Sequence, residues 1–187
     1  MEPQRIIHIW DRCKHNDRKA QAELYQHFAP KMYAICLRYA RDTFEAEDML
    51  QQGFIKVFTK SALFEGTGVL EGWIRRIIVN TAIEIYRKNK ISFVSTDEVS
   101  GAAMAEHSTL QLNNLDYKDL LKLIKGLPLG YKTVFNLYAI EGYNHREIAD
   151  MLQISEGNSK SQLSRARQLL RERITKMEEL GIWKIKN

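Results

Sequence analysis

Residues 141–170 read EGYNHREIADMLQISEGNSKSQLSRARQLL and contain a short helical pattern, a tight turn and a longer, basic helical pattern. Asn144 and Glu147 have the spacing of a capping box, which predicts a helix over residues 145–152. Ser155 is a candidate N-cap for the longer helix that follows. This order is typical of a helix-turn-helix, whose second helix enters the major groove of DNA.

The second helix of this motif has a strongly basic surface. Between Glu156 and Lys176 it carries six basic and two acidic residues. Its apolar spacing assigns Leu163, Ala166, Leu169 and Leu170 to packing. We interpret the remaining face as a DNA-contacting surface; the alternative is a solvated basic face on an ordinary helical bundle. That face comprises Ser159, Lys160, Ser161, Ser164, Arg165, Arg167 and Arg171.

Helical periodicity dominates the rest of the chain, and alternating strand patterns are nearly absent. We expect Asp17 to cap a helix from Lys19 to Phe28, and Pro30 to stand in the first turn of the next helix. Further helical patterns follow the capping-box pair Asp42 and Glu45 and cover about residues 70–90, 113–125 and 129–140. The sequence therefore predicts an all-α protein.

Charge divides the chain of 187 residues into three parts. Residues 1–90 carry 15 basic and 11 acidic side chains, and residues 113–187 carry 13 and 9. Residues 91–112 contain three acidic and no basic residues among Ser, Thr and Gly, a composition typical of a loop or linker. We predict two small helical domains, 1–90 and 113–187, joined by a flexible acidic linker.

Composition excludes several classes of site. The net charge of +5 and the pI of about 9.1 make an acidic partner plausible without identifying it. Cys13 and Cys36 are expected to be buried, reduced thiols, and no His/Cys cluster supplies the four or so ligands of a zinc site. We expect no metal and no cofactor. Since no signal peptide or membrane-spanning run is present, we expect a cytoplasmic protein.

The helix over residues 70–90 and the glycine-containing loop before it form a second candidate surface. Arg76, Asn80 and Arg87 provide polar and basic groups, and Phe64 and Trp73 provide aromatic rings. Aromatic rings that stack on bases and cations that follow phosphates hold single-stranded nucleic acid. Packing in the core is the alternative for both rings, and it is the preferred interpretation for Trp73.

We expect no enzymatic activity. The sequence contains no glycine-rich phosphate loop, nucleophile elbow or His-Glu metal motif, and its five histidines are scattered. One function that fits a helix-turn-helix on a second helical domain is a stand-alone regulator, with residues 1–90 as a sensing or dimerising domain.

Three motifs in order resemble those of bacterial RNA polymerase sigma factors. The first is DMLQQGFIKVF at residues 48–58, and the second is GWIRRIIVN at residues 72–80 together with Arg87. The third joins Leu127-Pro128, the EGY of residues 141–143 and the stretch from Glu147 to Arg167. The short two-domain layout is similar to the extracytoplasmic-function subfamily of the sigma-70 family. The resemblance covers nearly the whole chain, from about Asp17 to Leu170.

The resemblance implies a subunit that binds core RNA polymerase and gives it promoter specificity; the stand-alone regulator is then the alternative function. It implies contacts with the clamp helices of the β′ subunit by Asp48, Gln51 and Gln52, with the β flap as a further polymerase contact. The minus-ten residues would be Phe64, Trp73, Arg76, Asn80 and Arg87, and the loop of residues 64–71 and Asn80 would capture a flipped base. The minus-35 residues would be Lys160, Ser161, Ser164 and Arg165, with Arg167 and His145 on phosphates. The implied partners are promoter DNA and an anti-sigma factor.

Three residues depart from the family pattern. Val79 replaces a frequent Arg, Glu84 replaces the usual Asp, and Asn158 stands where Thr is common. The departures leave every defining motif in place, but they bear on the local contacts with promoter DNA.

Overall fold

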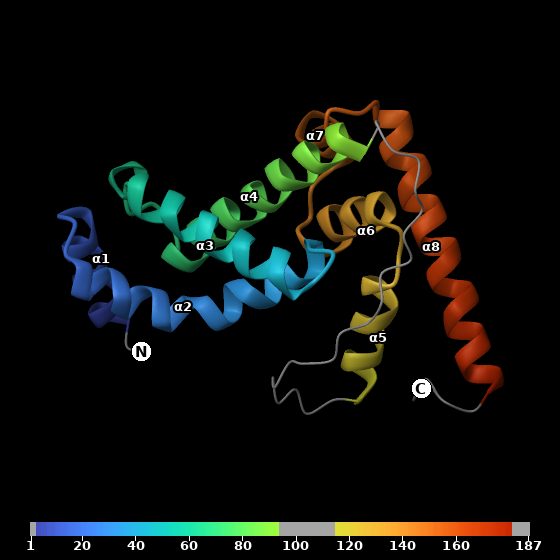
Figure 1. Cartoon of the computed structure of the whole chain (residues 1–187), viewed down its shortest axis with the longest axis horizontal. Helices are drawn as coiled ribbons and strands as arrows, with labels where there is room; N and C mark the ends of the chain where they lie inside the picture. The colour runs from blue at the N-terminus through green and yellow to red at the C-terminus, as the bar shows by residue number, and fades with distance from the viewer. Residues whose placement is uncertain (1–2, 94–114, 181–187) are drawn as a thin grey trace. The chain divides into compact units, whose positions relative to one another are not determined.

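The computed structural model describes residues 3–93 and 115–180, and every regular element in these two ranges is a helix (Figure 1). The predicted all-α fold class is therefore confirmed. The chain divides into two compact units, within residues 1–103 and 104–187. Most of the segment predicted as an acidic linker lies outside the described residues; its first three residues, 91–93, continue a helix instead.

The N-terminal unit is a bundle built around its second helix. Helix α2 packs against α1, α3 and α4, and α3 also packs against α4. The elements are α1 (Pro3–Lys14), α2 (Arg18–Tyr39), α3 (Thr43–Thr59), the short 3-10 helix η1 (Ser61–Leu63) and α4 (Leu70–Phe93).

The helices of this unit meet through apolar faces, and α3 and α4 approach each other closely at Gly53. A Cβ atom placed on Gly53 would lie 2.3 Å from Cδ1 of the buried Ile78, so any larger residue would have to displace that side chain. The buried face of α3 comprises Ala46, Met49, Leu50, Gly53, Phe54 and Val57, which recur with the helical period.

Helix α2 runs without interruption through Pro30, so the prediction of two separate helices was wrong. Pro30 lacks the N–H of an ordinary helical residue, and a proline inside a helix costs about 3 kcal/mol. Phe28 and Met32 on either side of it are 2% and 1% exposed. Burial of one such side chain contributes about 1.5–3 kcal/mol, so two of them offset the proline.

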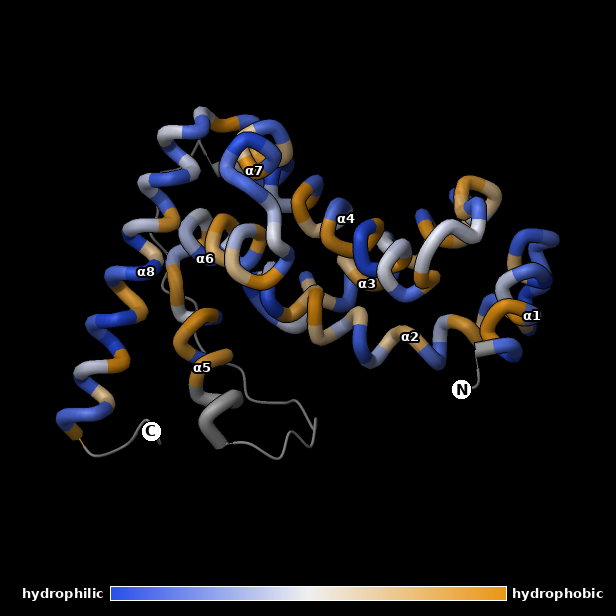
Figure 2. The backbone as a smooth tube through the Cα atoms, turned by 180° about the vertical axis from the view of Figure 1, so that it is seen from behind, coloured by the Kyte–Doolittle hydropathy of each residue, from blue (hydrophilic) through white to orange (hydrophobic). Residues whose placement is uncertain are grey.

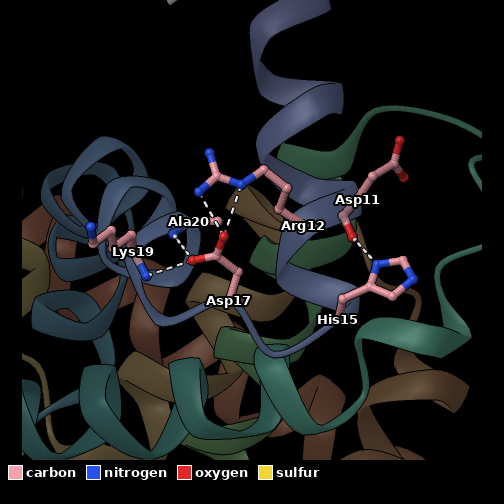
Figure 3. A network of polar contacts seen from close by, with 6 residues as sticks. All are labelled: Asp11, Arg12, His15, Asp17, Lys19 and Ala20. Carbon is pink, nitrogen blue, oxygen red and sulfur yellow. Dashed lines mark hydrogen bonds and ion pairs between the residues drawn. The ribbon is translucent and has the colours of Figure 1, made fainter.

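The junction between α1 and α2 is held by the carboxylate of Asp17 (Figure 3). One oxygen of Asp17 accepts hydrogen bonds from the backbone N–H groups of Lys19, at 2.9 Å, and Ala20, at 3.1 Å. The other accepts from Nε of Arg12 at 2.9 Å and from Nη2 at 2.6 Å. Asp17 thus caps α2 as predicted and also ties α1 to it. The hydrogen bond from Arg12 is the main reason that the pKa of Asp17 is lowered.

This junction predicts an acid-sensitive contribution to stability. Because the pKa of Asp17 is lower in the folded than in the unfolded state, its stabilisation is present above about pH 3.9 and is lost as the pH falls through the folded value. We expect the melting temperature of Asp17→Asn to fall less between about pH 6 and pH 3 than that of the wild type. Thermal unfolding followed by circular dichroism measures this difference. Asp11→Asn is the control, and equal pH dependence in wild type and Asp17→Asn would contradict the prediction.

The C-terminal unit contains α5 (Leu115–Lys125), α6 (Leu129–Phe135), the π-helical turn η2 (Asn136–Ile140), α7 (His145–Leu152) and α8 (Glu156–Glu179). Helix α8 packs against α5, α6 and α7. Figure 2 shows hydrophobic positions of α8 on the side toward α5 and α6 and hydrophilic positions on the outer side. One core cluster of this unit joins Ile124, Leu127, Ala166 and Leu170.

The helix predicted over residues 129–140 changes from α to π geometry at Asn136. The backbone N–H of Glu141 bonds to the carbonyl of Asn136 at 3.0 Å, which is one residue further back than in an α-helix. Gly142 then adopts φ +80°, and the N–H of Tyr143 bonds to the carbonyl of Leu137 at 3.0 Å. The closing bond from Tyr143 spans one residue more than in a Schellman motif, as expected for a helix that ends in π geometry, and the positive φ is the reason that glycine suits position 142.

Both cysteines are free thiols buried in the N-terminal unit, as predicted. Burial raises the pKa of Cys13 to about 11 and the pKa of Cys36 to about 12. None of the described helices has both the length and the apolar composition needed to cross a lipid bilayer.

Candidate nucleic-acid interface

Helices α7 and α8 form the predicted helix-turn-helix. The side-chain oxygen of Asn144 accepts from the N–H of Glu147 at 3.0 Å, and the Glu147 carboxylate accepts from the N–H of Asn144 at 2.8 Å. This complete capping box starts α7 at His145, as the sequence predicted. Gln153 makes the turn in the left-handed region, with φ 52°, and the side chain of Ser155 caps α8. Local side-chain chemistry therefore determines where both helices begin.

One face of α8 carries three long basic side chains and a serine. Lys160, Ser164, Arg167 and Arg171 follow each other at intervals of four, three and four residues, so they lie on the same side of the helix. We call these four residues the basic row. Together with His145 of α7 they line a surface hollow of about 390 Å³. Lys160, Arg167 and Arg171 place three positive charges in this hollow, which suits a DNA phosphate.

The ring of Tyr138, in the π-helical turn, organises two of these groups. It stacks on the imidazole of His145 with the ring centroids 4.7 Å apart and an interplanar angle of 25°. The guanidinium of Arg167 lies over the same ring, 5.4 Å from its centroid. The Nδ1 atom of His145 is 3.0 Å from the hydroxyl of Ser159. These contacts restrain the orientation of the imidazole, and Nδ1 is the ring nitrogen that they engage.

Ser159 was expected on the DNA-contacting surface of α8, and that expectation was wrong. Its side chain is fully buried and bonds to His145. Position 159 falls on the packed side of α8 because it precedes the buried Leu163 by one helical turn. The signal was present in the spacing of residues 159, 163, 166 and 170.

The remaining minus-35 candidates are exposed but have different surroundings. Arg165 lies on the flank of α8 away from Arg167, and its Nη1 donates a hydrogen bond of 3.2 Å to the hydroxyl of Tyr131 in α6. Lys160 forms an ion pair of 2.7 Å with Glu156, which lowers the pKa of that carboxyl. An exposed pair of this kind is weak, so Lys160 exchanges it readily for another anion. Ser161 is exposed between the two flanks.

A second row lies on α4. Trp73, Arg76, Asn80 and Arg87 are separated by three, four and seven residues and therefore share one face. Asn80 and Arg76 are exposed, and Arg87 and Trp73 are partly buried. We call these four residues the α4 row. It offers an amide and two cations beside an aromatic ring, which fits an unpaired nucleic-acid strand.

The loop before α4 adjoins this row. Gly66 and Gly68 have φ +79° and +96°, a backbone region that residues with a side chain rarely adopt. Leu63 and Val69 flank the loop with side chains that are 68% and 77% exposed. Phe64 packs on Trp73 with ring centroids 5.5 Å apart. Trp10 of α1 joins these two rings, a contact that the sequence did not reveal because Trp10 and Phe64 are 54 positions apart in the chain.

A third surface lies on α3. Asp48 and Gln51 are exposed, and Gln52 donates a hydrogen bond of 2.7 Å to Asp48. Phe44 and Ile55 continue the same side of the helix and are 81% and 62% exposed. These two apolar residues were not among the predicted site residues, although their spacing from Asp48 and Gln51 follows the helical period. We call Phe44, Asp48, Gln51 and Ile55 the α3 stripe.

The three departures from the family pattern have local explanations. Val79 is 1% exposed and belongs to the core. Glu84 forms an ion pair of 2.5 Å with Lys56 of α3. The side chain of Asn158 accepts a hydrogen bond of 2.9 Å from Gln162. Within residues 3–93 and 115–180, no group of three or more His, Cys, Asp or Glu side chains could hold a metal ion.

Both units of the chain match known protein families. The family model described as Sigma-70 region 2 matches residues 24–91, and the one described as Sigma-70, region 4 matches residues 117–170. The chain belongs to the extracytoplasmic-function group of the sigma-70 family. The α4 row of this sigma factor lies within the first match, and the basic row lies within the second except for Arg171, one residue past its end; α1 lies outside both matches.

Two relatives of this sigma factor from Bacillus subtilis (strain 168) are named ECF RNA polymerase sigma factor SigM and ECF RNA polymerase sigma factor SigW. Each is 28% identical to it; the alignments cover 80% and 86% of its chain and 91% and 92% of theirs. It is also similar to the sigma factor RpoE of Bartonella quintana, solved in complex with the anti-sigma factor NepR. The TM-score is 0.54 at 25% identity, over 82% of this chain and 96% of that one.

Proposed function

We propose that this sigma factor binds core RNA polymerase and directs promoter-specific transcription initiation. The N-terminal unit reads and melts the minus-ten element, and the C-terminal unit reads the minus-35 element. The observation that carries the proposal is the pair of separate nucleic-acid faces, the basic row and the α4 row, each on the unit that matches the corresponding sigma region. We propose that the subunit acts in the cytoplasm with the polymerase and has no enzymatic activity of its own.

In the C-terminal unit, one set of residues contacts the DNA backbone and positions α8, and another set contacts base edges. The hollow formed by His145 and the basic row accepts a backbone phosphate, which fixes the register of α8 in the groove. Arg165 and Ser161 then face base edges. A bidentate arginine on guanine is the commonest specific contact in the major groove.

In the N-terminal unit, melting and reading are coupled. A base pulled out of the stack can be read in a protein pocket, and its capture favours the separated strands. We propose that the exposed amide of Asn80 and the loop of residues 64–71 take such a base from the non-template strand. Arg76 and Arg87 follow the phosphates of the same strand.

The α3 stripe is the proposed surface for the polymerase. Two exposed apolar side chains, Phe44 and Ile55, enclose Asp48 and Gln51, and this mixture of apolar and polar groups is suited to a helical partner. The partner is the pair of clamp helices of the β′ subunit, with the β flap as a second contact of the sigma factor. An anti-sigma factor is a further proposed partner, supported by the complex in which RpoE of Bartonella quintana was solved.

Reconstitution with core polymerase tests the proposal. We expect the purified chain to bind the core and to start transcription at its own promoters, found by mapping transcription starts after overexpression. A stand-alone regulator would instead bind duplex DNA tightly without polymerase. Failure to bind core polymerase would contradict the proposed function.

Asn80→Ala separates melting from binding. We expect the polymerase carrying this variant to form the closed complex normally and to form the open complex more slowly, because the captured base loses its amide partner. Permanganate footprinting of unpaired thymines measures the open complex. A template melted in advance over the minus-ten element should restore transcription. Unchanged melting on duplex DNA would remove Asn80 from the site.

A further inference from the structure

We propose that Trp10, in α1, is a positioning residue of the minus-ten site: its ring holds Phe64 and Trp73 so that the loop between η1 and α4 is already shaped to receive an unpaired base. The inference rests on the proposed function of the N-terminal unit. It assigns a role to a helix that lies outside the matched sigma regions.

The three rings form a closed cluster. The Trp10 centroid lies 5.8 Å from that of Phe64 and 5.5 Å from that of Trp73, with interplanar angles of 84° and 70°. Phe64 and Trp73 are 5.5 Å apart at 50°. Edge-to-face arrangements at these distances are favourable for aromatic pairs. Each ring therefore contacts the other two, and removing Trp10 leaves both partners without support on one side.

The cluster is the buried anchor of an otherwise exposed loop. Every residue from Glu65 to Val69 is exposed, whereas Phe64 is partly buried. Two glycines with positive φ, Gly66 and Gly68, give this backbone unusual freedom. Such a loop requires an external contact to keep one conformation, and the contact between Phe64 and Trp10 provides it.

A role in packing alone does not explain the choice of tryptophan. Trp10 is 3% exposed, and its indole Nε1 is buried without a hydrogen-bond partner among the described residues. A buried, unpaired donor is unfavourable, and leucine would fill the interior without one. The wide ring of tryptophan is instead what reaches Phe64 and Trp73 together.

Helix α1 is held in turn by the junction between Arg12 and Asp17. The support thus runs from Asp17 through α1 to Trp10 and on to the loop. It leaves the exposed side chains of Leu63 and Val69 as the apolar groups that face a base, because Phe64 and Trp73 are engaged with Trp10. Apolar side chains next to a separated strand hold bases out of the stack.

The test compares three variants of the full chain assembled with core polymerase. Trp10→Leu removes the aromatic support, and Trp10→Phe keeps a ring while deleting the unpaired donor. Ile9→Ala is the control, because Ile9 is 2% exposed in the same helix and has no aromatic ring to contribute to the cluster. The probes are a fluorescent single-stranded oligonucleotide with the non-template minus-ten sequence, and a duplex with the minus-35 sequence. Anisotropy gives both affinities, and thermal unfolding gives stability.

We expect Trp10→Leu to weaken binding of the single strand about tenfold, within the range for loss of one base contact in such sites. Binding of the duplex should not change, and Trp10→Phe should restore most of the affinity for the single strand. Ile9→Ala should lower the melting temperature without this loss. Wild-type affinity in Trp10→Leu, or an equal loss in Ile9→Ala, would overturn the role of Trp10. If the wild-type complex does not bind the single strand, the proposed function is overturned, and the role of Trp10 with it.

Discussion

Replacing Arg167 with glutamate is expected to lower the affinity of the polymerase-bound sigma factor for duplex minus-35 DNA about 10- to 100-fold, similarly on every sequence. The guanidinium of Arg167 lies over Tyr138 and lines the hollow that also contains His145. A group held in this way loses little freedom when it binds a phosphate. The reversed charge both removes the contact and repels the phosphate.

The dependence of affinity on salt identifies the mechanism. Loss of one phosphate contact should reduce the slope of log affinity against log salt by about 0.9. Lys176→Glu is the matched control, because it makes the same change of charge in an exposed residue of α8 that does not line the hollow. Equal losses in the two variants would indicate a general effect of net charge rather than a contact.

Arg165→Ala should behave differently from Arg167→Glu. Its guanidinium is fixed by the hydroxyl of Tyr131 on the opposite flank of α8. If it reads a base edge, the variant should lose discrimination between the preferred and a substituted base, by about tenfold, while the salt slope stays nearly constant. An equal loss on all sequences would reassign Arg165 to a phosphate.

The second large effect is expected from Leu137→Ala, which should lower the free energy of unfolding of the C-terminal unit by about 2–5 kcal/mol. Leu137 is fully buried, and its backbone carbonyl closes the helix end at Tyr143. The cavity left by the substitution lies under the π-helical turn that carries Tyr138. The C-terminal unit should therefore open before the N-terminal unit does.

Hydrogen exchange measured by mass spectrometry distinguishes the two units in one experiment. Peptides from α6, α7 and α8 should exchange faster in Leu137→Ala, and peptides from α2 and α3 should not. Tyr138→Ala is the control, because its side chain is 36% exposed and leaves no closed cavity. Protection of α7 equal to that of the wild type would contradict the assignment of Leu137 to the core.

Elements with local signals could be predicted from the sequence. The start of α7 follows from the capping box of Asn144 and Glu147, and the buried face of α3 follows from its apolar spacing. Both signals act over one to four residues, so they do not depend on the rest of the fold. The grouping of the α4 row and of the basic row follows from the same helical period.

Features that depend on tertiary packing could not be predicted. Pro30 signals a helix boundary, but buried neighbours on both sides keep α2 continuous. The change to π geometry at Asn136 has no local signature. The role of Trp10 required the fold, because α1 and the loop are distant in sequence. Ser159 was misplaced for a simpler reason, since a small polar residue was read as exposed although its spacing places it among buried residues.

The two buried thiols of the N-terminal unit can report the rate at which that unit opens. With pKa values of about 11 and about 12, Cys13 and Cys36 stay protonated at neutral pH, and the protonated form attacks alkylating reagents poorly. The sequence has no other cysteine, so a maleimide dye would label only molecules in which the N-terminal unit has opened. The rate of labelling would then measure how often the N-terminal unit opens, and it would report nothing on the C-terminal unit, which has no cysteine.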